Sequence, residues 1–224
     1  MSPSVTHSDA IPVAFHAPVL VLEVAQLLSN ARHVLDCTLG GGGHTLALLE
    51  QGARVTGIDQ DPVAVEAATN RLQAFAAQGR FRAVLANFAD VDEHQEFAGE
   101  HFDGILLDLG VSSHQIDAEG RGFTFRQGAP LDMRMRPDAP TDAAAVLNES
   151  SEHELIRIFR EHADEPRAGR LAREIVRRRA RRPLATSDDL VGAIRAVLGP
   201  RSGPAEFAPL FQAVRIARRS DQVA

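Results

Sequence analysis

The sequence predicts an α/β fold in which a parallel β-sheet with crossover helices is followed by a purely helical part. Short apolar runs alternate with longer stretches of helical periodicity between residues 33 and 107, and this alternation is typical of a parallel sheet. After residue 140 only the helical periodicity continues. The chain has 224 residues, of which 44% are hydrophobic, so it is long enough to bury a substantial core.

Four apolar runs in the first half of the chain are the predicted strands. They span residues 33–37, 54–58, 81–85 and 102–107. Helices are predicted at residues 43–51 and 62–77, and the second is expected to use Asp61 as its N-cap because Pro62 suits the first helical position. A shorter helix is expected after Asp90.

The second half of the chain divides into a loop and a group of helices. Residues 110–140 are rich in Gly, Ser and Pro and have no clear period, which is typical of a functional or disordered segment. Helices are predicted at residues 151–163, 167–179 and 187–198, the last with Thr186 or Ser187 as its cap. We therefore divide the chain into a sheet region (1–110), a loop region (111–140) and a helical region (141–224).

Charge is distributed unevenly along the chain. The net charge is −6, but residues 1–165 hold 11 Arg against 25 acidic residues, whereas residues 166–224 hold 13 Arg against 5, and Lys is absent. A basic segment of this strength either contacts the phosphates of a nucleic acid or forms a solvated helix face. Charge alone does not separate these two interpretations.

Cysteine content and hydropathy restrict the setting of the protein. Cys37 is the only cysteine, so no internal disulfide is expected and a cytoplasmic location is predicted. No run of about 18 apolar residues is present, and residues 1–11 are polar and acidic, so we expect neither a membrane span nor a secretion signal. The nine His lack paired-ligand spacing, so no metal site is predicted.

Four consecutive glycines follow the first predicted strand. Gly40 to Gly43 lie before a helix start, where glycines allow the backbone to approach a ligand and free N–H groups point at it. The dinucleotide fingerprint G-x-G-x-x-G fails, because Thr45 or Leu46 occupies the third glycine position in the two registers. The loop therefore indicates a nucleotide-type site other than an NAD site, and a flexible turn without a ligand is the alternative.

Further candidate residues follow the later strands, at the same edge of the sheet. Asp59 is the candidate acceptor for the ribose hydroxyls of an adenosine, because Asp61 already supplies the helix cap. Phe88 either flanks an adenine or packs in the core. Asp108 is a carboxylate at the open carboxyl edge, where ligands bind. These features describe an S-adenosylmethionine site better than an NAD site, and the expected reaction is methyl transfer.

Six longer strings are more specific than a glycine loop. They are His16-Ala17-Pro18-Val19-Leu20, Asp36-x-Thr38-x-Gly40-x-Gly42-Gly43-His44, Gly57-Ile58-Asp59-Gln60-Asp61-Pro62, the run from Asp103 to Ser113, Arg121-Gly122-Phe123-x-Phe125, and Pro130-Leu131-Asp132-Met133-Arg134-Met135. In this order they resemble the RsmH-type (MraW) 16S ribosomal RNA cytosine-N4 methyltransferases, and the resemblance covers residues 16–216.

The resemblance implies a Rossmann-like fold, an S-adenosylmethionine cofactor, and methylation of the N4 amine of a cytosine in 16S ribosomal RNA of the small subunit, in the cytoplasm. The cofactor contacts that it implies are Gly42, Gly43, His44, Asp59, Phe88, Asp108 and Gln115. It also implies that the inserted helical part grips the RNA. The candidate RNA contacts are Arg121, Phe123, Arg126, Arg134, Arg167, Arg170 and Arg177.

The expected chemistry is direct attack by the cytosine amine. Cys37 lies in the first predicted strand rather than in an open loop, which argues against a covalent route. The N4 lone pair is delocalised into the ring, so acceptors for its N–H groups are expected. Asp108 is the candidate for this catalytic role. The D/N-P-P-aromatic signature of amino methyltransferases is absent, so the alternative is that Asp108 serves only the cofactor.

The chain supplies only the first four strands of a sheet that the family builds from seven, so an exposed sheet edge is expected. The chain is then an excerpt, a half completed by a partner or a second copy in a homodimer, or a truncated, non-catalytic relative that retains cofactor or RNA binding. A small-molecule methyltransferase is disfavoured by the basic helical region.

Overall fold

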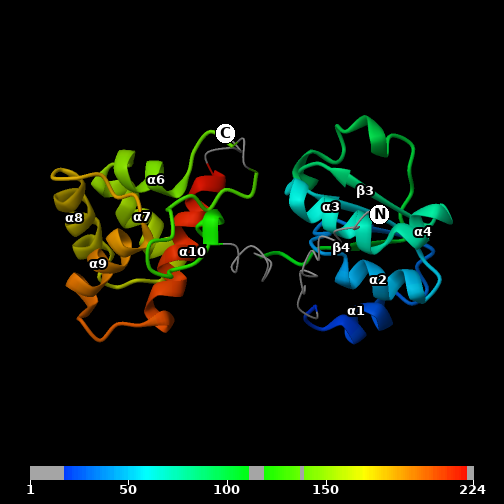
Figure 1. Cartoon of the computed structure of the whole chain (residues 1–224), viewed down its shortest axis with the longest axis horizontal. Coiled ribbons are helices and arrows are strands. Elements are labelled where there is room, and N and C mark those ends of the chain that lie inside the picture. Colours follow the sequence, from blue (N-terminus) through cyan, green and yellow to red (C-terminus); the bar gives the residue numbers. More distant parts are fainter. Residues whose placement is uncertain (1–17, 111–118, 137–138, 221–224) are drawn as a thin grey trace, which may run out of the picture.

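The computed structural model describes residues 18–110, 119–136 and 139–220. Figure 1 shows two lobes: an α/β lobe built from residues 18–110 and a helical lobe built from residues 119–220. Each lobe has buried cores of its own, with Leu48 and Ile58 in the α/β lobe and Phe159 and Leu171 in the helical lobe. The two halves of the sequence therefore bury their apolar side chains separately.

The predicted parallel sheet is confirmed. It contains β1 (His33–Asp36), β2 (Arg54–Asp59), β3 (Phe81–Leu85) and β4 (Gly104–Leu106). The described strands lie in the order β3-β2-β1-β4, and all three pairings are parallel. The chain direction along the sheet reverses between β1 and β4, and the carboxyl ends of these two strands therefore flank the crevice in which open α/β sheets bind ligands.

Four helices accompany the sheet: α1 (Val21–Leu27), α2 (Gly43–Glu50), α3 (Pro62–Arg71) and α4 (Gln73–Ala77). Asp61 caps α3 as predicted, because its Oδ1 accepts the N–H of Val63 at 3.1 Å. The single helix expected over residues 62–77 is interrupted at Leu72, which is fully buried and has non-helical dihedral angles. Burial of this side chain outweighs the helical periodicity.

Two short 3₁₀ turns, η1 (Phe88–Asp90) and η2 (Gln95–Phe97), connect β3 to β4. The expectation of a helix after Asp90 is wrong. This segment is polar and buries Phe97 as its single large apolar side chain, which is too little apolar surface to hold an amphipathic helix against the sheet.

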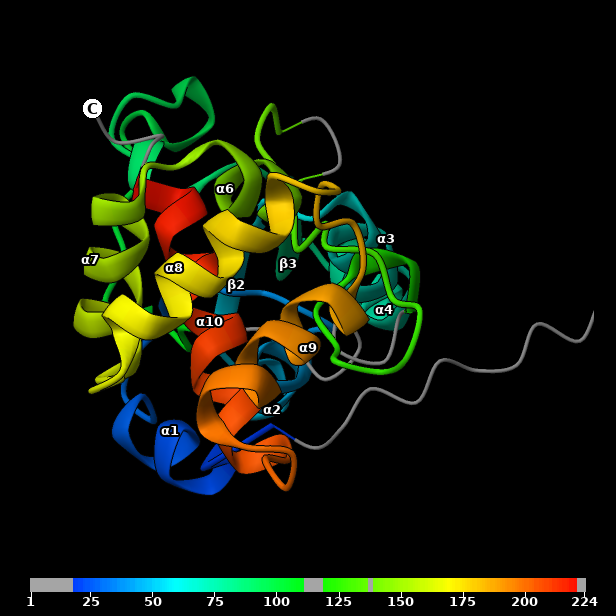
Figure 2. The same ribbon diagram turned by 90° about the vertical axis from the view of Figure 1, so that its left-hand side faces the viewer.

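The helical lobe consists of α6 (Ala143–Glu149), α7 (Glu152–Ala163), α8 (Ala168–Arg179), α9 (Ser187–Leu198) and α10 (Pro204–Ser220). Capping boxes begin two of these helices, Ser151 with Glu154 at α7 and Thr186 with Asp189 at α9. Figure 2 shows α8 and α9 on the outer side of the lobe, with α10 behind them and nearer the α/β lobe.

The segment 119–136, which we call the Arg121 loop, packs against the helical lobe. Leu131 and Met133 are buried in the core of that lobe. Pro130 forms an isolated antiparallel bridge with Thr186. Gly122 has φ +70°, and a Cβ there would lie 2.2 Å from the carbonyl oxygen of Pro130, so this turn requires glycine. The loop is held in place although it contains little regular secondary structure.

The edge of the sheet at β4 is exposed in the described part of the structure, as the sequence predicts. Ile105 is 59% exposed and Leu109, just beyond the strand, is 65% exposed. Unpaired strand edges and exposed apolar side chains are features that proteins usually cover. This face of the α/β lobe therefore lacks a covering layer in the described part of the chain.

Candidate cofactor and substrate site

The loop between β1 and α2 is braced by the buried carboxylate of Asp36. Its Oδ1 accepts the backbone N–H of Thr38 at 3.1 Å, and its Oδ2 accepts the hydroxyl of Thr45 at 2.6 Å. Burial raises the pKa of Asp36, and these two hydrogen bonds act in the opposite direction. Asp36 was recognised only as part of a motif, and its Asp-x-Thr spacing is the signal for this bracing role.

The glycines of the loop have different steric surroundings. Gly42 has φ +71° and precedes α2, and a Cβ there would lie 2.9 Å from Leu72. A Cβ at Gly43 would lie 3.0 Å from the ring of Pro18. Gly40 has φ +49° and faces open space, with no atom closer than 3.9 Å to a Cβ built there. Two glycines thus permit close packing of the protein itself, and Gly40 leaves room beside the loop.

Asp59 lies at the end of β2 and reaches the glycine loop. Its Oδ2 accepts the N–H of Gly40 at 2.9 Å, and its Oδ1 accepts the N–H of Asp61 at 2.9 Å. Burial raises the pKa of the Asp59 carboxyl, and the backbone hydrogen bonds counteract part of this effect. A carboxylate has about four acceptor positions, so Asp59 retains acceptor capacity for a further donor such as a ribose hydroxyl.

His44 and Asp108 meet at the crevice between β1 and β4. His44 lies on α2 and is 8% exposed, and its Nε2 lies 3.5 Å from Oδ2 of Asp108, whose side chain is 58% exposed. The N–H of Asp108 donates to the hydroxyl oxygen of Thr38 at 2.7 Å, which ties the end of β4 to the glycine loop. The structure therefore brings together Asp59, His44, Asp108 and the glycine loop at one edge of the sheet.

One polar atom at this edge has no partner among the described residues. The Nδ1 of His44 is buried and makes no hydrogen bond there. Buried polar atoms of native proteins are nearly always satisfied, by the protein, by water or by a ligand. An orphaned ring nitrogen next to an open glycine loop fits a bound polar group, and it is the strongest sign of a ligand position in the described structure.

The remaining predicted cofactor contacts are less well placed. Phe88, at the start of η1, packs partly buried against the core cluster of the sheet that contains Ile58 and Val84. Phe88 thus packs in the core, which was one of its two predicted roles. Its packing does not test a contact with adenine. Gln115 lies outside the described residues.

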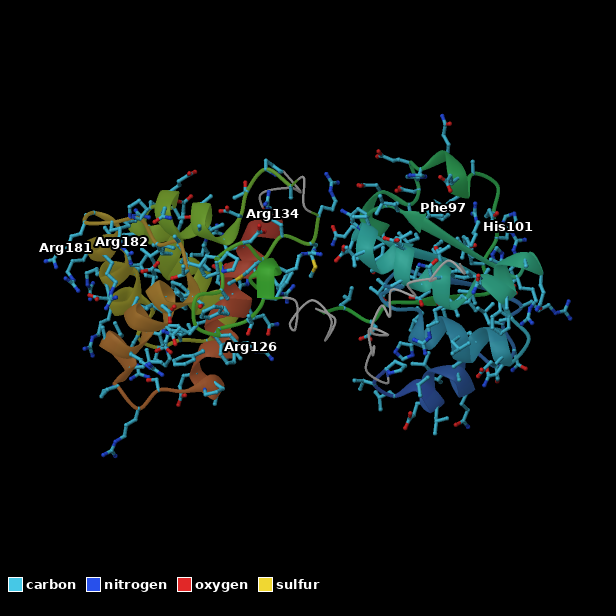
Figure 3. The ribbon with its side chains drawn as sticks, viewed as in Figure 1. Phe97, His101, Arg126, Arg134, Arg181 and Arg182 are labelled. Atoms are coloured by element: carbon cyan, nitrogen blue, oxygen red, sulfur yellow. The ribbon has the colours of Figure 1, made fainter. Side chains whose placement is uncertain are left out.

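Two of the predicted RNA contacts in the Arg121 loop are engaged within the protein. Arg134 grips Asp132 with two hydrogen bonds of 2.8 Å and donates to the carbonyl of Ala139 at 3.1 Å. Arg121 lies 3.0 Å from the Asp61 carboxylate. Phe123 packs partly buried against the helical core. Arg126 is exposed. Figure 3 shows Arg126 and Arg134 on the side of the helical lobe that faces the α/β lobe.

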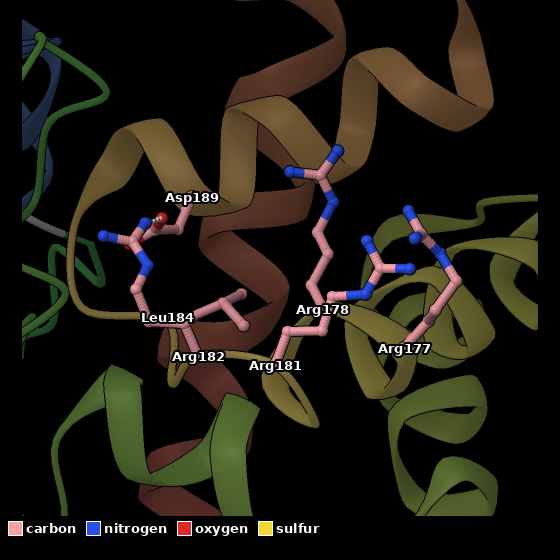
Figure 4. A pocket seen from close by; sticks show the side chains of 6 residues that line it. All are labelled: Arg177, Arg178, Arg181, Arg182, Leu184 and Asp189. Atoms are coloured by element: carbon pink, nitrogen blue, oxygen red, sulfur yellow. Dashed lines mark hydrogen bonds and ion pairs between the residues drawn. The ribbon is translucent and has the colours of Figure 1, made fainter.

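Arginines also line a hollow of about 330 Å³ at the carboxyl end of α8. Its lining residues are Arg177, Arg178, Arg181, Arg182, Leu184 and Asp189, and Figure 4 shows their arrangement. Arg177 binds Glu174 with hydrogen bonds of 2.9 and 2.7 Å, which hold the pKa of that carboxyl at about 2. Only Arg177 of this set was selected from sequence, although the arginine run after it was visible.

The other two predicted RNA contacts on α8 differ in their surroundings. Arg167 precedes the helix and donates from Nε to Glu165 at 3.1 Å. Arg170 is exposed on the first turns of α8. Arginines near both ends of α8 therefore reach the surface of the helical lobe, and their positive charge is only partly compensated by Glu165 and Glu174.

Cys37 is unsuited to a nucleophilic role. It directly follows β1, is buried, and burial raises the pKa of its thiol to about 11, whereas the thiolate is the reactive form. Among the described residues, no group of three His, Cys, Asp or Glu side chains is placed to hold a metal ion. Within the same residues, no helix has the length and apolar character needed to span a membrane.

The parallel sheet, the glycine loop and the carboxylates at its open edge define a Rossmann-like α/β protein with a nucleotide-type site. A family model described as the MraW methylase family matches residues 13–221, and the chain belongs to this family. The resemblance drawn from the sequence strings is thereby confirmed.

Individual relatives agree with this assignment. The ribosomal RNA small subunit methyltransferase H of Gemmatimonas aurantiaca is 63% identical over 203 residues, which are 91% of this chain and 64% of that relative. The protein of the same name from Heliobacterium mobile is 46% identical over 212 residues, 90% of this chain and 67% of its own. The chain thus spans about two thirds of the length of these relatives. Among solved structures, a putative O-methyltransferase from Klebsiella pneumoniae gives a TM-score of 0.36 at 20% identity over 44% of this chain and 46% of its own, which is too low to support an argument.

Proposed function

We propose that the chain is the cofactor-binding and RNA-gripping part of an enzyme that transfers a methyl group from S-adenosylmethionine to the N4 amine of a cytosine in 16S ribosomal RNA. The observation that carries the proposal is the convergence of the glycine loop, Asp59, His44 and Asp108 at the crevice between β1 and β4. Membership of the MraW methylase family and the printed names of the relatives supply the reaction and the substrate class.

S-adenosylmethionine would be held along this crevice and would supply a methyl group activated on a sulfonium. Asp59 would accept a ribose hydroxyl with its remaining acceptor capacity, next to the open side of Gly40. His44 would direct its unpartnered Nδ1 to a polar group of the cofactor. Gly42 and Gly43 shape the loop, and Phe88 and Gln115 complete the proposed contact set.

Asp108 is the proposed acceptor for the target amine. Its carboxylate is more than half exposed at the open edge, while its backbone N–H is fixed by Thr38. An acceptor so placed can bind an N4–H and hold the amine in line with the methyl group. Contact of Asp108 with the cofactor alone is the other role that this geometry allows.

The helical lobe is the proposed RNA grip. Ribosomal RNA offers a dense row of phosphates, and arginine side chains bind them as charge-assisted donors. Arg126, Arg167, Arg170, Arg177 and the other arginines of the α8 hollow are the proposed contacts, joined by Arg121, Phe123 and Arg134 from the loop. The target cytosine must also leave its stack to reach the crevice.

We further propose that residues 1–110, 111–140 and 141–224 act as cofactor region, active-site loop and RNA-binding region, and that the protein works in the cytoplasm, where its ribosomal substrate is found. The exposed β4 edge supports a homodimer. It also favours a second candidate function, a non-catalytic relative that retains cofactor or RNA binding, because a sheet with an open edge leaves the crevice uncovered on one side.

Calorimetric titration of S-adenosylmethionine into the chain tests the proposal. We expect saturable binding by the wild type and about tenfold to hundredfold weaker binding by Asp59→Asn, because hydrogen bonds to a charged group contribute roughly 1.5–3 kcal/mol. Asp92→Asn, which makes the same change at an exposed position, is the matched control. Absence of wild-type binding, or equal binding by Asp59→Asn, contradicts the proposal. Binding without methyl transfer to small-subunit RNA would support the second candidate function.

A further inference from the structure

We propose that Arg121 is a positioning residue that ties the Arg121 loop to the Asp59–Asp61 turn of the cofactor site, so that cofactor binding and the order of the loop are coupled. The tie itself rests on contacts within the chain. The coupling to S-adenosylmethionine rests on the proposed function. This role differs from the RNA contact that the sequence suggested for Arg121.

Asp61 lies in a buried, hydrogen-bonded turn. Its side chain is 2% exposed and already caps α3 through Val63. Its backbone N–H donates to Oδ1 of Asp59, so the two acidic residues form one hydrogen-bonded turn at the end of β2. A buried carboxylate needs a charge partner, because leaving it unpaired carries a large desolvation penalty. The other lobe supplies a cationic partner, Arg121.

Arg121 contacts this carboxylate through one guanidinium nitrogen. Its Nη1 lies 3.0 Å from Oδ2 and 3.3 Å from Oδ1 of Asp61, across 60 residues of sequence. Its Nη2 donates to the carbonyls of Arg134 at 3.0 Å and Met135 at 2.7 Å. The guanidinium thus bridges the cofactor turn and the far end of the Arg121 loop, and only a planar fork of donors reaches all of these acceptors at once.

The backbone around Arg121 is constrained and leaves the Arg121 side chain little conformational freedom. The carbonyl of Arg121 accepts the N–H of Met133 at 3.0 Å. Gly122 has no space for a Cβ against Pro130, and the Arg121 side chain itself is only 21% exposed. The loop therefore closes around Arg121 and fixes the direction in which the guanidinium leaves it.

The coupling follows from these contacts. A ligand bound to Asp59 restricts the Asp59–Asp61 turn, and the ion pair passes this restriction to the carbonyls of residues 134 and 135. Linkage is reciprocal, so a loop ordered by its substrate strengthens cofactor binding by the same factor. The same loop presents Arg126 and Phe123, which places the proposed RNA contacts under the control of the cofactor turn.

Limited digestion with trypsin tests the tie directly. The chain has no Lys, so trypsin cuts only after Arg, and exposed Arg126 reports on the loop. In the cofactor-free protein we expect Arg121→Gln and Asp61→Asn each to speed cleavage after Arg126 about tenfold, and the double variant to add nothing further. Asn still offers an oxygen to cap α3, so Asp61→Asn isolates the loss of the ion pair.

The controls separate positioning from a general loss of structure. Arg157→Gln removes an exposed ion pair with Glu161 on α7 and should change nothing. Arg121→Lys keeps the positive charge but not the planar set of guanidinium donors. Compared with Arg121→Gln, it should therefore restore Tm more fully than it restores the resistance of Arg126 to trypsin. Additive effects of Arg121→Gln and Asp61→Asn would overturn the tie.

Addition of S-adenosylmethionine tests the coupling. We expect it to slow cleavage after Arg126 in the wild type and to have no such effect in Arg121→Gln, with Arg121→Lys as the second variant if the Gln variant does not fold. Equal protection in wild type and variants would overturn the coupling. Failure of the wild type to bind S-adenosylmethionine would contradict the proposed function and the coupling, while the additivity test in the cofactor-free protein still decides the tie.

Discussion

At the scale of single residues, His44 and Asp108 show how strand order creates a site. Sequence places them 64 positions apart, but β4 pairs with β1, and α2 follows β1 directly, so both side chains arrive at one crevice. Asp59 reaches the same crevice from β2 through its hydrogen bond to Gly40. Asp59 ends β2, Asp108 lies two residues beyond β4, and His44 lies in the first turn of the helix that follows β1. This meeting was predictable, because carboxyl ends of parallel strands share an edge.

Other residue roles were not predictable from sequence. Nothing in the glycine string distinguishes Gly42, which makes room for Leu72, from Gly40, which faces open space. The partner of Arg121 was equally hidden, since Asp61 already had an assigned role as a helix cap. Contacts between distant segments depend on tertiary packing, which local pattern does not encode.

Cys37 predicts a pH dependence of the free energy of unfolding, and few other side chains of this protein titrate in the same range. The chain has no Tyr and no Lys, so Cys37 is the one side chain expected to titrate between pH 9 and 11. Burial raises the pKa of the folded thiol from its ordinary value of 9.0 to about 11. In this window the folded state keeps the proton that the unfolded state loses, so the free energy of unfolding should fall as pH rises.

Urea denaturation at pH 8, 9.5 and 10.5 measures this decline. The Cys37→Ser variant should show a flat profile over the same range, since Ser does not titrate there. An equal decline in both proteins would mean that the thiol is not its source.

At the scale of elements, the strands were predicted to within two residues at each end, because short apolar runs between turn residues leave few alternatives. The helices that packing alone stabilises were harder. α1 was not predicted, and the helix at 62–77 breaks at Leu72. α10, which contains Pro209, was not among the predicted helices. At Leu72, tertiary burial overrides the local helical periodicity.

The α8 hollow yields a prediction at the same scale. We expect Arg181→Gln to weaken binding of a short single-stranded RNA about threefold to tenfold at low salt and to reduce the salt slope by about one phosphate contact. Fluorescence anisotropy at several salt concentrations measures both quantities. Arg201→Gln removes the same charge from an exposed turn between α9 and α10 and serves as the control. Equal losses in the two variants would indicate net charge rather than a site.

At the scale of the whole molecule, two lobes have separate cores, and among the described residues the Arg121–Asp61 ion pair joins them. The α/β lobe carries the proposed cofactor contacts, and the helical lobe carries the arginines of the α8 hollow. The basic segment from residue 166 onward lies in the helical lobe, whereas the acidic segment extends from the α/β lobe into the helical lobe as far as α7 (Figure 1).

The exposed β4 edge predicts self-association of this chain. Sedimentation velocity over a range of protein concentrations should show a dimer that Ile105→Glu weakens, because a charge on the edge strand disfavours pairing. Leu27→Glu, at an exposed apolar position on α1, is the control for general loss of apolar surface. A wild type that stays monomeric throughout the range would remove the homodimer from the proposed function.

The order of the two lobes along the chain has a consequence for synthesis on the ribosome. Strands β1 to β4 and the Asp59–Asp61 turn are translated before Arg121, which follows Asp61 by 60 residues. At about 5–20 residues per second, this interval lasts roughly 3–12 s. During it the Asp61 carboxylate has been synthesised, whereas Arg121, which pairs with it in the folded protein, has not. Completion of the interlobe ion pair is thus a late event of biogenesis, and the order of the chain itself sets its timing.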